Sequence, residues 1–259
     1  MRRASTCVAV LALALMALTG VASAAPTVTF KAEAVPIAGY PHTGNILGAG
    51  AAVKAEYTIS GTEYGGFPPP LVGVNFYLPT GAKLHPGGFP TCPLATLEPA
   101  GRGPAGCPKG SAAGPVGTVL GIVSFGSERV PEEATLESFY APGGGLEFFT
   151  SGHSPVSLEI LSKAHYVNLG GGEGFGPKLI AEVPLVATVP GAQYASVTTI
   201  KIKAGSARGP KKHPVYYGTL PKKCPKGGFP IKSEMTFEAV PGFPRQTVTN
   251  LYKAPCPRH

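Results

Sequence analysis

Histidine, glutamate and cysteine are the residue types in this chain that could bind a metal ion or take part in catalysis. The sequence contains no aspartate, so neither a Ser-His-Asp triad nor the usual carboxylate cage for calcium can be assembled from it. Its histidines are scattered without the spacing of metal ligands: His42, His85, His153, His165, His213 and His259. No Gly-x-Ser-x-Gly or His-Glu-x-x-His motif occurs. The sequence therefore predicts no metal site, no cofactor and no identifiable catalytic residue.

Glutamate pairs are the remaining route to catalysis, because glycosidases act with two carboxylates that face each other across a cleft. Glu132 and Glu133 are adjacent and would point apart on a strand. Glu147, Glu159 and Glu173 could supply such a pair only if the fold brings them together. A secreted hydrolase that uses Glu and His therefore stays open as an alternative function.

Four cysteines follow the N-terminal region, and their spacing favours a structural role. They are Cys92, Cys107, Cys224 and Cys256. Four cysteines allow three pairings, and we favour the two local ones, Cys92 with Cys107 and Cys224 with Cys256. A zinc site would need cysteines paired two to four residues apart, and these cysteines contain no such pair. Disulfides are the usual fate of cysteines in an exported chain.

The N-terminus has the features of a secretory signal peptide covering residues 1–24. Arg2 and Arg3 precede an apolar run at residues 8–18, and small residues at 22–24 form a cleavage site. The run is shorter than the ~20 apolar residues that span a bilayer, and no later stretch is long and apolar enough to do so. We expect the remaining chain, from about Ala25, to be secreted or associated with the cell wall.

Short segments of alternating apolar and polar residues recur along the chain between glycines and prolines. They lie at residues 28–33, 52–59, 71–78, 116–125, 134–140, 146–150, 156–167, 179–189, 195–204, 215–220, 231–240 and 246–252. Such segments, rich in Val, Thr, Ile, Tyr and Phe, are typical of strands. We predict an all-β fold: an antiparallel β-sandwich of jelly-roll or immunoglobulin-like type with about a dozen short strands. One short helix is expected near residues 93–98, where Pro93 suits a first turn.

Two look-alike segments surround the cysteines. Residues 87–90 and 227–230 both read Gly-Gly-Phe-Pro, and residues 107–110 repeat the Cys-Pro-Lys-Gly of residues 224–227. The likeness suggests that a single β-sandwich domain at residues 25–259 contains two similar halves at an offset of about 140 residues. Convergent turn chemistry explains it equally well, because such strings form loops easily in a chain rich in glycine and proline.

Positive charge is concentrated in one part of the chain. Residues 201–232 contain no glutamate and hold Lys201, Lys203, Arg208, Lys211, Lys212, Lys222, Lys223, Lys226 and Lys232. A cluster of like charge attracts a polyanion. The alternative is a solvated face that keeps the protein soluble and protects exposed strand edges with lysine.

Three strings resemble those of a family of exported proteins from high-GC Gram-positive bacteria. They are residues 87–98 (GGFPTCPLATLE), 106–111 (GCPKGS) and 220–230 (LPKKCPKGGFP). The resemblance extends over most of the chain after the signal segment. It implies export, the local cysteine pairing and a β-rich fold, and it implies no activity and no functional residue.

A secreted, non-catalytic protein of the bacterial envelope or extracellular space is the function that these features favour. Its partner would be an anionic cell-wall polymer or another envelope protein, contacted through the basic residues. Nucleic acid is a poor partner, because only Tyr216 and Tyr217 interleave with the basic residues. A sugar-binding sandwich is a further alternative, and it would need exposed rings such as Tyr57, Tyr77 or Phe149 on one sheet face.

Overall fold

The computed structural model describes residues 25–40, 46–98 and 101–257, so the expected signal peptide lies outside the described residues. The main strands are β1 (Thr27–Val35), β2 (Ala52–Ser60), β3 (Leu71–Pro79), β5 (Gly117–Phe125), β6 (Glu128–Tyr140), β7 (Leu146–Gly152), β8 (Leu158–Asn168), β9 (Phe175–Glu182), β10 (Ser196–Ala204), β14 (Phe229–Phe237) and β15 (Gln246–Ala254). Four further strands of two residues each form two separate small sheets, β4 with β13 and β11 with β12. They are β4 (Lys83–Leu84), β11 (Ala207–Arg208), β12 (Val215–Tyr216) and β13 (Gly218–Thr219).

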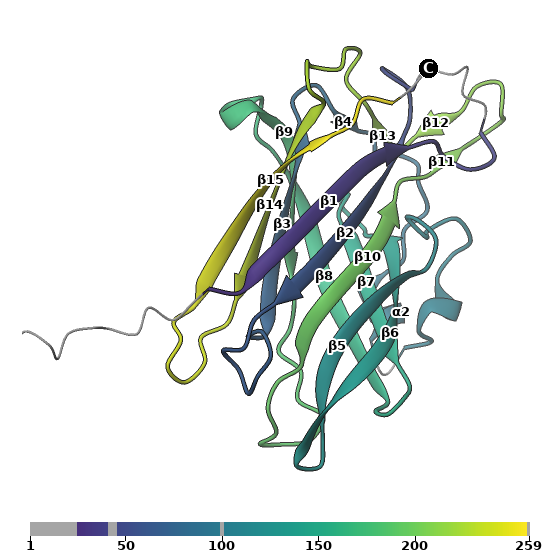
Figure 1. Ribbon diagram of the computed structural model, residues 1–259. Helices are drawn as coiled ribbons and strands as arrows, with labels where there is room; N and C mark the ends of the chain where they lie inside the picture. Colours follow the sequence, from purple (N-terminus) through teal and green to yellow (C-terminus); the bar gives the residue numbers. More distant parts are fainter. Residues whose placement is uncertain (1–24, 41–45, 99–100, 258–259) are drawn as a thin grey trace, which may run out of the picture.

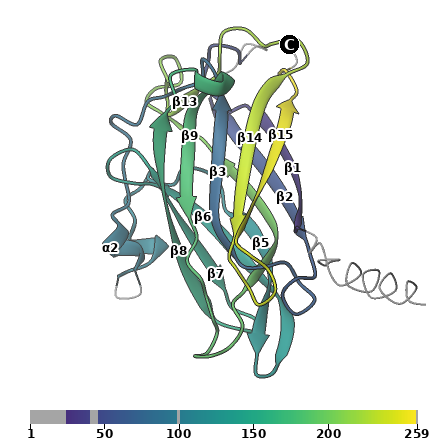
Figure 2. The ribbon, with the colours of Figure 1, turned by 90° about the vertical axis from the view of Figure 1, so that its left-hand side faces the viewer.

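The main strands form one antiparallel sheet in the order β1-β2-β10-β5-β6-β7-β8-β9-β3-β14-β15. The sheet curls until its first strand, β1, lies against its last, β15 (Figures 1 and 2). Curling of this kind follows from the regular twist between neighbouring strands. The expected layers of a sandwich therefore arise within a single, nearly closed sheet.

The prediction of an all-β, antiparallel fold with one short helix and two disulfides is confirmed. The helix is α2 (Leu94–Leu97), and the disulfides join Cys92 to Cys107 and Cys224 to Cys256. Several strand predictions differ from the structure; the strand expected at 134–140, for example, begins at Glu128. The strand expected at 179–189 ends at Glu182, shortly before a proline at 184 that cannot donate to a sheet ladder. The strand expected at 215–220 divides into β12 and β13, which pair with different partners.

The first disulfide loop covers part of the outer face of the sheet. Leu97 of α2 and Cys92 are buried against Phe139 of β6 and Phe149 of β7, both of which point away from the inside of the curled sheet. Cys92 is also tied to β6 by a hydrogen bond from its amide to the carbonyl of Tyr140, at 2.8 Å. The loop thereby gives these outward rings an apolar cover that the sheet alone lacks.

The look-alike segments do not share a conformation. Residues 87–98 form a turn followed by α2, whereas residues 227–238 form a turn followed by β14. The likeness of the two strings therefore does not extend to their secondary structure.

The half of the curled sheet formed by β1, β2, β3, β14 and β15 is densely packed. Phe30 stacks on Tyr57 with ring centroids 4.8 Å apart, and Met235 and Phe237 of β14 are almost fully buried beside them. Ser233, inward-facing on the same strand, donates a hydrogen bond to the Tyr57 hydroxyl at 3.1 Å. This half is a conventional core, in which the side-chain amide nitrogen of Asn250 on β15 is a buried polar group without a hydrogen-bond partner among the described residues.

Helices long and apolar enough to cross a bilayer do not occur in the part of the chain that the structure describes.

Candidate ligand-binding cavity

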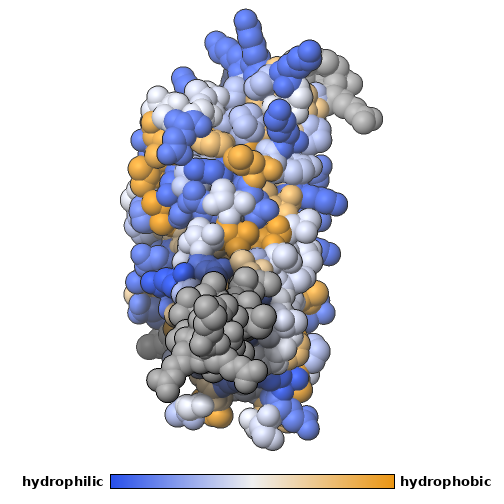
Figure 3. Space-filling model, turned by 60° about the vertical axis from the view of Figure 1, so that its left-hand side comes forward, coloured by the Kyte–Doolittle hydropathy of each residue, from blue (hydrophilic) through white to orange (hydrophobic). Residues whose placement is uncertain are grey.

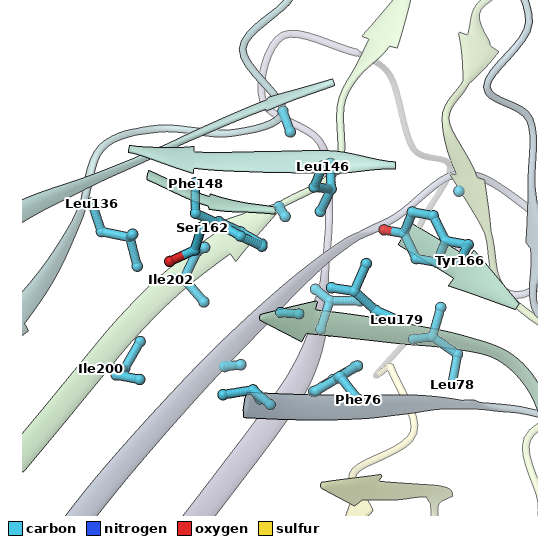
Figure 4. Close-up of a pocket in the computed structure, with 18 of the residues that line it drawn as sticks. Phe76, Leu78, Leu136, Leu146, Phe148, Ser162, Tyr166, Leu179, Ile200 and Ile202 are labelled. Carbon is cyan, nitrogen blue, oxygen red and sulfur yellow. The ribbon is translucent and has the colours of Figure 1, made fainter. Parts of the chain in front are cut away.

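The other half of the curled sheet is hollow. A cavity of about 250 Å³ lies between eight strands, β2, β10, β5, β6, β7, β8, β9 and β3, and we call it the barrel cavity. Figure 4 shows side chains from opposite walls converging on it, including Phe76 of β3, Leu136 of β6, Phe148 of β7, Leu179 of β9 and Ile200 of β10. The lining is overwhelmingly aliphatic and aromatic.

Strand alternation explains how these side chains reach the interior. On β10, Ile200 and Ile202 line the barrel cavity, while Lys201 and Lys203 point outward. A bulge between Val197 and Thr199 shifts the register, so that Val197 and Ile200 both face inward although they are three residues apart. The same alternation in β14 places its inward side chains in the packed half. Alternation alone therefore does not determine whether an inward side chain meets packed neighbours or the barrel cavity.

A space of this size would be costly for a folded protein if nothing filled it. With the ~24 cal/mol per Å³ measured for closed engineered cavities, an unfilled volume of about 250 Å³ would correspond to roughly 6 kcal/mol of packing. Inward side chains such as Phe76, Phe148, Leu179 and Ile202 are only half-buried, whereas Met235 and Phe237 of the packed half are buried. Several side chains of the cavity lining are therefore more accessible than the buried centre of the packed half.

Three hydroxyl groups of the cavity lining have no hydrogen-bond partner among the described residues. They belong to Thr150 of β7 and to Ser162 and Tyr166 of β8. Figure 4 shows Ser162 and Tyr166 on the wall of the space, each with its oxygen drawn toward the interior. Burial raises the pKa of Tyr166 well above its ordinary value, so its phenol stays protonated and can donate a hydrogen bond. These groups are available to a bound molecule.

Aromatic side chains and a short two-stranded cover close one end of the barrel cavity. Tyr140 and Tyr217 stack with ring centroids 4.0 Å apart, and Phe89 packs edge-on against both. The Tyr140 hydroxyl bonds to the Ser206 hydroxyl at 2.8 Å, and the Tyr217 hydroxyl donates to the carbonyl of Gly144 at 2.9 Å. Burial raises the pKa of Tyr140 to about 12.

The cover itself consists of β4 paired with β13. Gly50 forms a β-bridge with Thr219 of β13, and the amide of Ala51 donates to the carbonyl of Gly218 at 3.2 Å. β13 is thus bonded to β4 on one side and to the segment around Gly50 and Ala51 on the other. Because Lys83 and Leu84 of β4 line the barrel cavity, the cavity extends up to this cover.

The predicted basic residues do not form one face. Lys201 and Lys203 lie on the outer face of β10, where Lys201 is paired in register with Glu56. Lys232 forms ion pairs with Glu173 and Glu234 at 3.0 and 3.2 Å, and it also lies over the Tyr77 ring.

The remaining basic residues lie in the connection between β10 and β14. Arg208 lies over the Phe89 ring, with its guanidinium carbon 5.4 Å from the ring centroid. Arg208 is exposed, and so are Lys211, Lys212, Lys222, Lys223 and Lys226; none of the six has an ion-pair partner among the described residues. In this connection the expected basic surface therefore consists of Arg208 and five lysines.

The carboxylates considered for hydrolysis do not converge. On the β7–β8 ladder, Glu147 pairs with Lys163 and Glu159 pairs with Ser151, so the two carboxylates are four residues, or about 13 Å, apart along the strands. Glu173 lies beyond the far end of β8 and is paired with Lys232.

Two buried carboxylates are isolated from each other. Glu132 is buried and Glu133 exposed, as the alternation predicted. Glu147 is buried with one oxygen unpaired, and desolvation raises its pKa despite the opposing effect of Lys163.

Groups of three or more potential metal ligands are absent from the described residues.

The rings proposed for sugar binding are buried, which removes that role for them. Tyr57 lies in the packed half, 4 % exposed, and Phe149 lies under the first disulfide loop, also 4 % exposed. Tyr77, 5 % exposed, is covered by Lys178 and Lys232 and donates a 2.6 Å hydrogen bond to Glu234. Sequence alternation placed these rings in strands but could not show that other side chains cover them.

The barrel cavity is the site that sequence analysis missed. Residue type gave no clear signal: cavity-lining positions of β8 and β10 include Ser162 and Ile200, and buried positions of β14 include Ser233 and Ile231 beside methionine and phenylalanine. Comparison with known proteins adds nothing to this assignment, since no family model, no curated protein and no solved structure matches the chain.

Proposed function

We propose that the chain is a secreted, non-catalytic binding protein that holds a small apolar molecule in the barrel cavity. The observation that carries the proposal is the hollow half itself: an apolar space of about 250 Å³ surrounded by a continuous sheet, beside a half with a buried hydrophobic core. Ligand sites are typically concave, mostly apolar and furnished with a few polar groups that orient the ligand. The unpaired hydroxyls of Thr150, Ser162 and Tyr166 are groups of that kind.

The size of the cavity limits the ligand. An engineered cavity of ~150 Å³ lined by aliphatic and aromatic residues stays dry and binds benzene. Scaled to the larger volume here, a ligand with roughly ten carbon atoms would fit. Two disulfides are consistent with an extracellular location, since they form and persist in oxidising compartments.

Decanol is a suitable probe, because it has ten carbons and one neutral polar group. We expect it to raise the midpoint of thermal unfolding in a concentration-dependent manner, because a ligand that binds only the folded state stabilises it. The measurement is a calorimetric or fluorescence melting curve at increasing decanol concentration, with propanol as the control for solvent effects. An unchanged or lowered midpoint at decanol concentrations near its solubility limit would contradict the proposal.

Binding of an anionic cell-wall polymer is a second candidate function, favoured by the five unpaired lysines between β10 and β14. Clustered positive charge attracts polyanions and is screened by salt. We expect retention on isolated cell wall at low ionic strength and release as salt is added. Reversing the charge of Lys211, Lys212, Lys222 and Lys223 together should abolish retention, and retention that survives these substitutions would contradict this candidate.

A further inference from the structure

Access to the barrel cavity is restricted to the ends of the curled sheet. Every neighbouring pair of strands around the cavity, from β2 through β10, β5, β6, β7, β8 and β9 to β3, is joined by a hydrogen-bonded ladder. The remaining seam, between β2 and β3, is filled by the packed half. A ligand therefore enters past the loops at one end.

The lining identifies which end. Lys83, Leu84, Gly218, Thr219 and Leu220, all in or beside the β4–β13 cover, line the cavity. The connections at the opposite end contribute only Val183, the first residue after β9, to the lining. These connections are residues 61–70, 126–127, 153–157, 183–195 and 238–245. The cavity therefore approaches the surface at the end that carries the cover.

The same end is strongly basic. The connections at this end are residues 36–51, 80–116, 141–145, 169–174 and 205–228. They contain only two acidic residues, Glu98 and Glu173. Their basic residues are Lys83, Arg102, Lys109, Arg208, Lys211, Lys212, Lys222, Lys223 and Lys226. The connections at the opposite end contain one arginine, Arg245, and two glutamates, Glu63 and Glu238. Figure 3 shows hydrophilic side chains projecting from the top of the molecule, where this basic end lies.

The lining of the cavity, in contrast to the basic end, is almost free of charged side chains. Lys83 is the only residue of the lining with a charged side chain; it is exposed and has no ion-pair partner among the described residues. An ionised headgroup cannot be moved into the apolar interior without a large desolvation cost, so it would have to remain at the cover. Tyr166, near the end of β8 on this side, supplies an unpaired hydroxyl that can donate to an oxyanion there.

We propose that the ligand is a single-chain amphiphile with an anionic headgroup, bound with its chain in the barrel cavity and its headgroup beside Lys83 and Tyr166. The inference rests on the proposed function, and it adds the chemical class of the ligand and the direction of entry. A fatty acid of about ten carbons has the required chemistry. The basic end attracts such a molecule from solution, and the apolar lining retains its chain.

Three straight-chain probes with alkyl chains of nine or ten carbons and different headgroups test this inference: decanoate, decanol and decyltrimethylammonium. At low ionic strength we expect decanoate to bind at least tenfold more tightly than decyltrimethylammonium and several-fold more tightly than decanol, as measured by isothermal titration calorimetry. In Lys83→Glu, decanoate should lose about tenfold in affinity while decanol binding stays within twofold. Tyr166→Phe should weaken decanoate more than decanol, because only the carboxylate accepts a charge-assisted hydrogen bond.

Lys31→Glu is the matched control, since Lys31 is exposed on the outer face of β1 and carries the same charge change away from the cover. It should leave the order of the three affinities unchanged. If decanol and decanoate bind equally well and Lys83→Glu changes neither, the anionic ligand is ruled out while the apolar cavity function stands. If none of the three binds, the proposed function itself fails.

Discussion

The Ser162→Phe variant is expected to lose at least tenfold in affinity for decanol while unfolding at the same or a higher denaturant concentration than the native protein. Ser162 is buried on β8, lines the barrel cavity and has no hydrogen-bond partner among the described residues. A phenylalanine ring at this position would occupy space that the ligand needs and would replace an unpaired hydroxyl with apolar surface. Filling a cavity and removing an unpaired polar group both stabilise a folded protein. The measurements are calorimetric titration and urea unfolding.

The control places the same ring on the other face of the same strand. Glu159 is exposed on β8 and points away from the cavity, so Glu159→Phe adds an identical side chain outside it. Decanol binding should be unchanged in this variant. Decanol affinity in Ser162→Phe equal to that of the native protein, with both variants folded, would place the binding site elsewhere.

Phe237→Ala is expected to destabilise the protein by about 3–5 kcal/mol, the range for removing a fully buried phenylalanine. Phe237 of β14 is 1 % exposed and lies in the packed half. The same substitution at Phe148 of β7, which faces the hollow half and is half-buried, should cost only about 1–2 kcal/mol, because the ring already lacks neighbours on its cavity side.

Urea unfolding of the two variants measures this difference directly, with the slope of the unfolding curve as a check that both unfold from an equally compact state. Phe148→Ala should in addition bind larger apolar probes than the native protein, because it enlarges the cavity. Equal destabilisation by the two substitutions would mean that the two halves are packed alike.

The sequence predicted the strands and cysteine pairs well because both depend on local chemistry. Alternation in segments such as β2 and β14 reflects one buried face, and the two disulfides close short stretches of chain. The sequence could not show how the single sheet curls, because the meeting of β1 and β15 depends on twist summed over eleven strands.

The cavity and the true extent of the basic surface escaped prediction for the same reason. Ile200 and Ile231 both occupy inward positions of alternating strands, yet Ile200 lines the barrel cavity and is half-buried, whereas Ile231 is buried in the packed half. Likewise, the ion pair between Lys232 and Glu173 joins residues 59 positions apart, so counting lysines along the chain overestimated the free charge. Alternation identifies the buried face of a strand, whereas packing across the interior is set by partners distant in the sequence.

The number of decanol molecules bound per chain, measured by equilibrium titration of the folded protein, tests the central claim most directly. A single saturable site per chain, lost in Ser162→Phe and retained in Glu159→Phe, is the result expected for a ligand held in the barrel cavity. Binding that does not saturate, or no binding up to the solubility limit of decanol, would contradict the claim that the hollow half of the sheet is a ligand site.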